Sequence, residues 1–500
     1  MSNLHIARVG IFNVDQTGSR IDKNDPNTTI QQLAATRQEA LAIADSNLPN
    51  TTGYPTIKDY IQAESNDGFE LQYMDSSFII TSTSATVLPT SLDAFGRNRS
   101  SEPYTLGDYK HLYSADTNFI NQTSNGGTIT HSLDKVAVTL STSNNPASSA
   151  LHQTKLYHQY QPGKSQLIYT SFVLGPAVTN VTKRIGYFDD RNGIYLEQTG
   201  DGTLNWVIRS YATGAVDETG TRIPQSSWNV DTLDSTGPSG IDLNVNSTQL
   251  LFIDFQWLGV GVVRCGFVSG GKHILAHEFT HSEATTVYMN HPNLPIRSQI
   301  LNTGTTDGTS FDHICASVQS EGGYREVGTD WQISNPAPRN TPIQGGTPLP
   351  VLALRLKNTY NTTLNRMHAI LNSLGLYVQT TAIKYTIVKL PDANSLTTTD
   401  PSLVWTSVNN ESGCEYCVNA TGYNQANAEP MFGGFASSGT SQNSRSEVGA
   451  SGITTSRKNF ISQNYDSTNS EIYAIIAQTI STGNNDTAAV ISSLQWREIY

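Results

Sequence analysis

The segment from Leu250 to His281, LLFIDFQWLGVGVVRCGFVSGGKHILAHEFTH, constrains the fold more than any other part of this sequence. It ends in HEFTH (His277–His281), which matches the H-E-x-x-H pattern of zinc proteases. On a helix, the two histidines lie one turn apart on one face and can bind a single zinc ion. On a strand, they lie roughly 13 Å apart and Glu278 points to the opposite side. The pattern is therefore a zinc site only if this segment is helical.

The local sequence favours a three-stranded antiparallel meander. Gly270-Gly271 comes just before Lys272, as in a hairpin turn, and Leu258-Gly259-Val260-Gly261 is a second candidate turn. The stretch between these turns is rich in strand-forming residues. The metzincin continuation is also missing, because Ala284 and Val287 stand where its glycine and third histidine would be. We therefore expect residues 272–281 to be extended, with no metal bound by HEFTH.

The composition suits β-sandwiches with long polar loops better than a helical enzyme. Charged residues make up 14% of the chain, compared with roughly 25% in typical soluble proteins. A net charge of −12 and a pI of about 5.3 argue against nucleic acid or an anionic membrane as the main partner. No apolar run approaches the ~20 residues of a membrane span, and the first residues lack the features of a secretory signal. We therefore expect assembly in a cytoplasm.

The first 126 residues read as a small α+β region followed by a polar connector. A helix is expected to begin at Thr28 or Thr29, and Tyr54–Ala63 is a second short helical candidate. Phe69–Met74 and Phe78–Ile80 have the pattern of strands. We interpret this region as a docking segment.

The rest of the chain divides into two β-rich regions joined by a linker. Residues 127–335 predict a first antiparallel β-sandwich, and the proline-rich residues 336–350 predict the linker. Residues 351–500 predict a second sandwich domain that ends in a hairpin, with residues 412–459 as long surface loops. The expected strands include Lys135–Leu140, Gln166–Leu174, Gly193–Gln198, Leu204–Tyr211, Ile472–Ile480 and Ala488–Glu498.

Two further sets of side chains could carry chemistry. Asp189-Asp190 with Glu197 could form the carboxylate pair of a glycoside hydrolase, but the two aspartates lie in a predicted turn, where Asp is common. Three tryptophans could stack on sugars, although two of them, Trp206 and Trp257, fall in predicted strands and are expected in the core. The tryptophans are Trp206, Trp228 and Trp257.

The four cysteines form no recognisable metal or redox motif. Cys414 and Cys417 make a lone C-x-x-C, without the second pair that a zinc ribbon needs. We expect these two and the scattered Cys265 and Cys315 to be free thiols in a reducing compartment, and a distant pairing stays open. The sequence as a whole predicts no catalytic, cofactor-binding or metal-binding residue and no cofactor.

Several stretches together resemble a sandwich module found in virion structural proteins of tailed bacteriophages, notably marine and cyanobacterial ones, and of some large DNA viruses. The resemblance covers roughly residues 160–500. It is carried by Gly186–Glu197, Gln225–Asp231 with Leu233-Asp234, Phe252–Arg264, Ala276–Phe279, Leu294–Arg297 and Leu494–Ile499. It implies a concanavalin-like or jelly-roll β-sandwich in a particle component, with the HEFTH stretch as a strand and no metal.

The sequence therefore predicts a mostly β, non-enzymatic virion protein of the tail, baseplate, fibre or capsid surface. Its expected partners are other virion proteins, reached through the N-terminal region, further copies of the same chain, and a host-surface glycan. Nucleic acid and membrane insertion are not expected. Two alternatives stay open, namely a glycan-binding receptor protein on the same scaffold and an H-E-x-x-H zinc hydrolase or depolymerase.

Overall fold

The computed structural model describes two units of the chain, Met1–Arg99 and Ser100–Tyr500. In the first unit it describes the backbone of residues 5–10 and 29–34. In the second it describes residues 102–259, 261–281, 286–305, 307–325, 327–341, 348–437, 460–480 and 487–499. None of the described helices is long and apolar enough to cross a membrane.

The described part of the first unit is an antiparallel pair of strands. β1 (His5–Gly10) pairs with β2 (Thr29–Ala34) over six residues. The helix expected to begin at Thr28 or Thr29 is therefore wrong over β2. Pairing with β1 satisfies the backbone groups of this segment, and this long-range interaction outweighs the helical pattern. The expected helix at Tyr54–Ala63 and the strands at Phe69–Met74 and Phe78–Ile80 lie outside the described residues.

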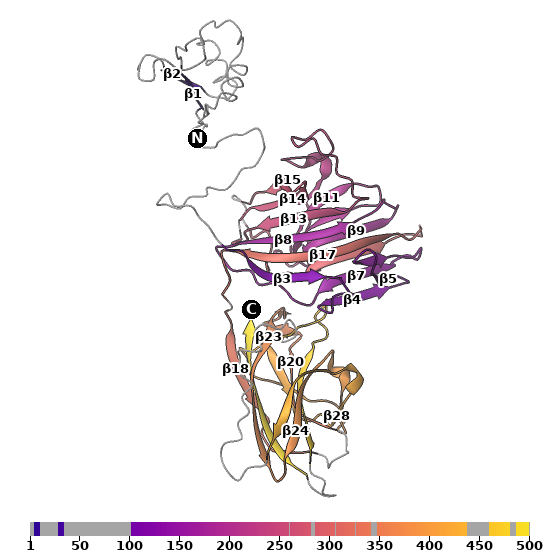
Figure 1. The fold of residues 1–500 in the computed structure, drawn as a ribbon, viewed down its shortest axis with the longest axis vertical. Coiled ribbons are helices and arrows are strands. Elements are labelled where there is room, and N and C mark those ends of the chain that lie inside the picture. Colours follow the sequence, from indigo (N-terminus) through magenta and orange to yellow (C-terminus); the bar gives the residue numbers. More distant parts are fainter. Residues whose placement is uncertain are drawn as a thin grey trace. The chain divides into compact units, whose positions relative to one another are not determined.

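The first sandwich of the second unit has two antiparallel sheets (Figure 1). Among the described residues, one sheet has seven strands in the order β12-β11-β10-β9-β16-β7-β4. Their bounds are β4 (Phe119–Ser124), β7 (Ser149–Thr154), β9 (Val181–Phe188), β10 (Gly193–Gln198), β11 (Leu204–Arg209), β12 (Arg222–Pro224) and β16 (Ile296–Asn302).

The facing sheet has eight strands within the described ranges, in the order β15-β14-β13-β8-β17-β6-β5, with β3 also paired to β17. Apolar side chains of the two sheets form one continuous core. The bounds are β3 (Tyr104–Lys110), β5 (Thr128–Ser132), β6 (Ala137–Ser141), β8 (Ser165–Val173), β13 (Gln249–Phe255), β14 (Val263–Ser269), β15 (Lys272–Phe279) and β17 (Ser310–Glu321).

The meander predicted around HEFTH is confirmed. β13, β14 and β15 are adjacent antiparallel strands, and Gly270 and Gly271 make the turn between the last two. Both glycines have positive φ, of 57° and 77°, which is the backbone that a two-residue hairpin turn of this kind requires. Thr280 and His281 follow the end of β15 in non-helical backbone. Residues 272–279 are therefore extended, as predicted, with a register shift opposite Cys265 and Gly266 that interrupts the alternation.

The strand pairing places the edges of the first sandwich differently from the sequence-based boundaries. β3 and β4 precede residue 127, yet they pair with β17 and β7 and complete the first sandwich. β18 (Thr329–Ser334) precedes the expected linker, yet it pairs with the last strand of the chain. Local composition marks polar or proline-rich segments, but it does not say which distant strand completes their hydrogen bonding.

The second sandwich also has two antiparallel sheets. In the described residues, one has the order β18-β32-β23-β30 with β19 added to β32, and the other has the order β26-β27-β20-β31-β24-β29. The bounds are β19 (Arg339–Asn340), β20 (Leu349–Leu356), β23 (His368–Gln379), β24 (Ile383–Leu390), β26 (Trp405–Ser407), β27 (Cys414–Cys417), β29 (Glu429–Ala436), β30 (Phe460–Ile461), β31 (Ile472–Thr479) and β32 (Ala489–Ile499).

Short elements complete the described second unit. Two small two-stranded sheets pair β21 (Thr359–Tyr360) with β22 (Thr363–Leu364), and β25 (Leu396–Thr397) with β28 (Gly422–Tyr423). The described helices are single 3-10 turns, η2 (Gln225–Ser227), η3 (Ala393–Ser395) and η4 (Gln425–Asn427).

Two expectations for the second sandwich are wrong. The last two long strands are not a hairpin, because β31 pairs with β20 and β24 while β32 lies in the other sheet. Residues 412–459 are not only loops, because they contain β27 and β29. β29 carries Pro430, Gly433 and Gly434, and it lies at the edge of its sheet, where such residues are tolerated.

Candidate functional site

The HEFTH residues are separated on an extended backbone and make structural contacts. The backbone N–H of Asn229 donates to Nδ1 of His277 at 3.2 Å. Glu278 forms an ion pair with Arg264 at 2.9 Å. His281 stacks on Tyr288 with ring centroids 4.2 Å apart. Each of these side chains has its own partner, so the residues of HEFTH do not form the helical zinc site of an H-E-x-x-H protease.

The candidate carboxylates also serve the fold. Oδ1 of Asp189 accepts backbone N–H groups from Arg191 and Asn192, both at 2.8 Å, as the predicted turn requires. Asp190 pairs with the buried Arg297. Glu197 lies on β10, where it pairs with Arg184 at 2.7 Å and with Arg222. These groups are bound to arginines and backbone, and they do not form a carboxylate pair around a substrate.

The tryptophans do not form an exposed platform. Trp206 is fully buried and Trp228 is 4% exposed, and both contact the core of the first sandwich. Trp257 follows the end of β13 instead of lying on a strand, and it is half-buried with Nε1 donating to the Met289 carbonyl at 2.8 Å. The core role expected for Trp206 is confirmed, and Trp257 packs against the same core.

All four cysteines are free thiols, as expected. Cys414 and Cys417 stand at the two ends of β27 and are buried. Residues three apart on a strand point to opposite faces, so these two thiols cannot chelate one ion together. Burial raises the pKa of Cys414 well above its ordinary value. The lone C-x-x-C is therefore a packing feature of the second sandwich.

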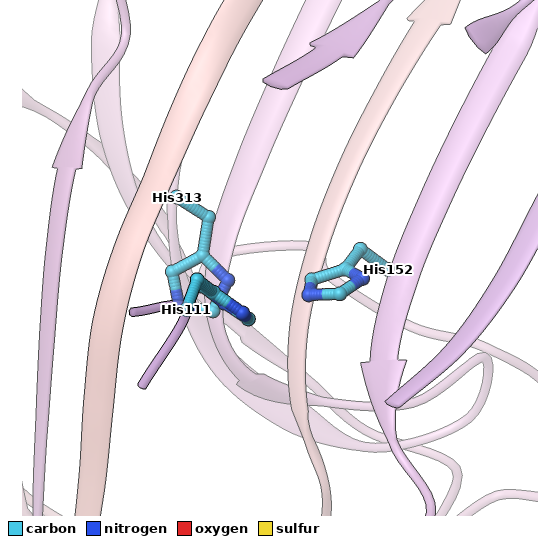
Figure 2. A group of neighbouring side chains, drawn as sticks. All are labelled: His111, His152 and His313. Atoms are coloured by element: carbon cyan, nitrogen blue, oxygen red, sulfur yellow. The ribbon is translucent and has the colours of Figure 1, made fainter. Parts of the chain in front are cut away.

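A cluster that the sequence did not indicate lies inside the first sandwich. His111 directly follows β3, His152 lies on β7 and His313 lies on β17 (Figure 2). All three side chains are fully buried. One ligand nitrogen from each lies within 4.8 Å of the others. We call these three residues the histidine cluster.

The histidine cluster is surrounded by aromatic and polar groups of the same sandwich. Phe119 stacks on His152 with ring centroids 4.0 Å apart and planes inclined by 3°. Nδ1 of His152 lies 2.6 Å from Oδ1 of Asn121, which can only accept, so Nδ1 carries the proton. The backbone N–H of Asp116 donates to Nδ1 of His111 at 3.1 Å.

Burial keeps the histidine cluster neutral near pH 7. It lowers the pKa of His111 to about 4, and the pKa of His313 to about 3 with the neighbouring His111 acting in the same direction. The pKa of His152 is lowered well below its ordinary value by burial and by the other two rings. Neutral imidazoles keep a lone pair on one nitrogen, which is the form that binds a metal.

No local sequence pattern indicates the histidine cluster. Its members come from three separate segments and form no spacing motif, so only the pairing of β3, β7 and β17 within the sandwich brings them together. The expectation that the chain has no metal-binding residue rests on local motifs alone, and such motifs do not cover residues brought together by distant strands.

Comparisons with known proteins give similar solved structures at low sequence identity. No family model matches the chain, and no curated protein matches it. Solved structures that it resembles include a protein of unknown function from Shewanella oneidensis MR-1, at 12% identity and TM-score 0.30, covering 46% of this chain and 91% of that one.

Two other similar structures come from a phage protein and from a bacterial protein. One is the CBM2 module of the evolved Dit of Lactobacillus casei BL23 phage J-1, at 8% identity and TM-score 0.30, covering 45% of this chain and all of that one. The other is a Bacteroides ovatus mixed-linkage glucan GH16 protein, at 10% identity and TM-score 0.29, covering 43% of this chain and 99% of that one. At such identities and scores these similarities carry no argument about activity.

Proposed function

We propose that this chain is a non-enzymatic structural component of a bacteriophage virion, in the tail, baseplate, fibre or capsid surface. There it contributes to particle assembly and to contact with the host surface. The observation that carries the proposal is a buried polar junction that joins the two sandwiches into one structural unit.

The junction contains a buried carboxylate held by lysines from both sandwiches. Oε1 of Glu471, in the second sandwich, lies 3.0 Å from Nζ of Lys155 in the first. Its Oε2 lies 2.9 Å from Nζ of Lys389 in the second. Although burial acts to raise it, the two lysines hold the pKa of Glu471 below its ordinary value. The charged form of Glu471 is therefore the one that the junction stabilises.

A second set of contacts lies around Tyr157 of the first sandwich. The guanidinium of Arg366 lies over its ring, 4.6 Å from the centroid, and reaches Asp189 at 3.4 Å. Nε2 of His368 lies 3.1 Å from the Tyr157 backbone N. These partners are buried, so separating the sandwiches would leave charged and polar groups without their partners, at a large cost in free energy.

The same geometry supports a role without catalysis. The carboxylates, tryptophans and HEFTH histidines that could have formed an active site are each used for packing, turns or ion pairs. A structural component of a particle needs a stable, fixed arrangement of domains more than an open substrate site. In this account the N-terminal region attaches the chain to other virion proteins, and the sandwiches contact neighbouring copies or proteins.

A specific observation favours glycan binding as a second candidate. On the face of the eight-stranded sheet turned away from the core, the hydroxyl of Tyr169 lies 2.7 Å from Nε2 of His273. Phe252 packs edge-on against the same histidine. Burial, with the nearby Glu321, raises the pKa of Asp254 to about 6. Aromatic rings beside a few polar groups are suited to bind sugars.

Purified particles test the main proposal. Virions of the phage that encodes the chain should be separated from infected-cell lysate on a density gradient and probed with an antiserum raised against this protein. We expect the protein to co-sediment with the particles. Its presence in lysate together with its absence from particles would exclude a virion role.

A glycan array tests the second candidate. Binding that is lost in Tyr169→Ala and kept in Tyr377→Ala, an exposed tyrosine of the second sandwich, would support a glycan site on the eight-stranded sheet. No binding by the wild-type protein, or equal binding by both variants, would reject that site.

A further inference from the structure

The histidine cluster joins distant parts of the first sandwich at one buried point. His152 belongs to the seven-stranded sheet and His313 to the eight-stranded sheet, while His111 follows β3. The ring centroids of His111 lie 5.3 Å from those of both other histidines, and those of His152 and His313 lie 5.6 Å apart. In Figure 2 the ring of His152 faces the other two.

These spacings fit three imidazoles around a single ion. Zinc binds histidine nitrogen at roughly 2.0–2.1 Å and takes tetrahedral geometry, which puts the ring centroids of any two ligands about 5.2 Å apart. The observed spacings lie close to that value. The ring planes of the three pairs are inclined by 55°, 76° and 71°. No pair is therefore stacked, and each ring can direct a nitrogen at a common centre.

The nitrogens that would bind an ion lack other partners in the described structure. Nε2 of His152 is buried and has no hydrogen-bond partner, and its lone pair is free because Nδ1 carries the proton. Both ring nitrogens of His313 are also buried, and neither has a partner at hydrogen-bonding geometry. The nearby backbone of Cys315 acts to raise the pKa of His313, but its effect is smaller than that of burial. Buried polar atoms without partners are costly, and a bound ion removes that cost.

His111 requires one adjustment. Its Nδ1 accepts the Asp116 N–H, so in the metal-free molecule its buried, unpartnered Nε2 carries the proton. Coordination through Nε2 moves that proton to Nδ1 and gives up the hydrogen bond from Asp116. Coordination through Nδ1 displaces the same N–H. In either case a single hydrogen bond is exchanged for a metal–nitrogen bond.

We propose that His111, His152 and His313 bind one divalent transition-metal cation, with Zn²⁺ as the ion best suited to three imidazoles. Three protein ligands leave the fourth position to a group that is not part of the chain, such as water. The donor set contains no carboxylate, so it disfavours Mg²⁺ and Ca²⁺, which prefer oxygen ligands.

The ion would be a structural cross-link. All three ligands are fully buried, so a substrate has no route to the metal. The ion would tie the seven-stranded sheet, the eight-stranded sheet and the segment after β3 to one centre. Because it binds the folded state, it would raise the stability of the first sandwich according to its free concentration and affinity.

A dry aromatic cluster is the competing explanation. Phe119 stacks on His152 and lies 5.4 Å and 5.7 Å from the rings of His111 and His313, centroid to centroid. Three neutral imidazoles can pack with a phenyl ring without an ion. If an ion is bound, the stability of the first sandwich depends on the imidazole nitrogens. If the rings only pack together, it depends on their apolar contacts and not on the nitrogens.

Metal titration of the full chain distinguishes them. The protein is stripped with a chelator, dialysed and titrated with Zn²⁺ in competition with a chromophoric chelator, and its thermal unfolding is followed with and without Zn²⁺. The test variant is His152→Phe, which keeps an aromatic ring against Phe119 but removes the nitrogens. The matched control is His281→Phe, which keeps an aromatic ring against Tyr288 and lies outside the histidine cluster. Co²⁺ added to the wild-type protein provides a visible spectrum that needs no variant.

We expect one equivalent of Zn²⁺ per wild-type chain, a rise in the unfolding temperature on binding, and the strong visible bands of tetrahedral Co²⁺. His152→Phe should weaken zinc binding at least about 100-fold and abolish the thermal shift, while His281→Phe should leave both unchanged. Equal zinc affinity in wild type and His152→Phe would overturn the proposal. If His152→Phe does not fold, the cobalt spectrum decides, and its absence from the wild-type protein overturns the proposal.

Discussion

Lys155 of the first sandwich and Glu471 of the second form an ion pair with Nζ and Oε1 3.0 Å apart, although 316 positions separate them in the sequence. The pair is largely buried, with side-chain exposures of 28% and 11%. Lys389 binds the other carboxylate oxygen at 2.9 Å. One carboxylate therefore pairs with two lysines at the junction, and its removal should affect both sandwiches.

Glu471→Gln should destabilise the protein by roughly 3–5 kcal/mol, because it leaves the buried Lys389 without its counter-charge. Urea unfolding followed by tryptophan fluorescence measures the change. The control is Asp330→Asn, which breaks the exposed Asp330–Arg497 pair and should cost less than about 1 kcal/mol. Equal losses in the two variants would contradict a buried junction.

Stability should fall as the pH falls from 7 to 4. Burial lowers the pKa values of His158 and His313 to about 3 and of His368 to about 4, below the ordinary 6.5. Below pH 6.5 the unfolded chain binds protons that the folded chain does not, so each such histidine should cost about 1.4 kcal/mol per pH unit until its folded pKa is reached.

The charge on Glu471 also makes stability fall as the pH falls. The pKa of Glu471 is lowered in the folded state, so the stability that its charged form contributes is lost when acid protonates it. Urea midpoints at pH 7, 6, 5 and 4.5 measure the trend, with metal ions removed by a chelator. A midpoint that does not change between pH 7 and 5 would disagree with neutral buried histidines.

Gly193→Ala should destabilise the first sandwich by roughly 2–5 kcal/mol. Gly193 begins β10 with φ of 148°, and an added Cβ would overlap with Cβ of Phe188. Gly270→Asn is the matched control, since Gly270 has φ of 57°, which asparagine tolerates, and open space around it. Thermal unfolding of both variants measures the difference, and similar losses would argue against the tight β9–β10 turn.

His277→Gln should leave zinc content unchanged and cost roughly 1–2 kcal/mol, because His277 loses only the hydrogen bond that its Nδ1 accepts from the Asn229 N–H. Metal analysis and urea unfolding of the variant check this outcome. Loss of bound zinc in His277→Gln would indicate that HEFTH, and not the histidine cluster, holds an ion.

The sequence was most informative where structure is local. Alternation along residues 272–281 and the Gly270-Gly271 turn identify the β14–β15 hairpin, because the side-chain period and the turn backbone depend on neighbouring residues alone. The turn role of Asp189 was predictable for the same reason, since its carboxylate binds backbone two and three residues ahead.

Long-range pairing accounts for the features that the sequence did not indicate. β31 and β32 look like a hairpin because they are consecutive, but each finds its partners in a different sheet. β2 has a helical pattern, but it pairs with β1. The histidine cluster and the Lys155–Glu471 pair likewise depend on which strands become neighbours, and no local period encodes that choice.

A particle reconstruction tests the central claim most directly. The account predicts that a map of the phage particle contains density for two adjoining β-sandwiches into which residues 102–499 fit, with Lys155 and Glu471 at their junction. A particle map in which every protein component is assigned and none accommodates this pair of sandwiches would contradict a role as a virion structural protein.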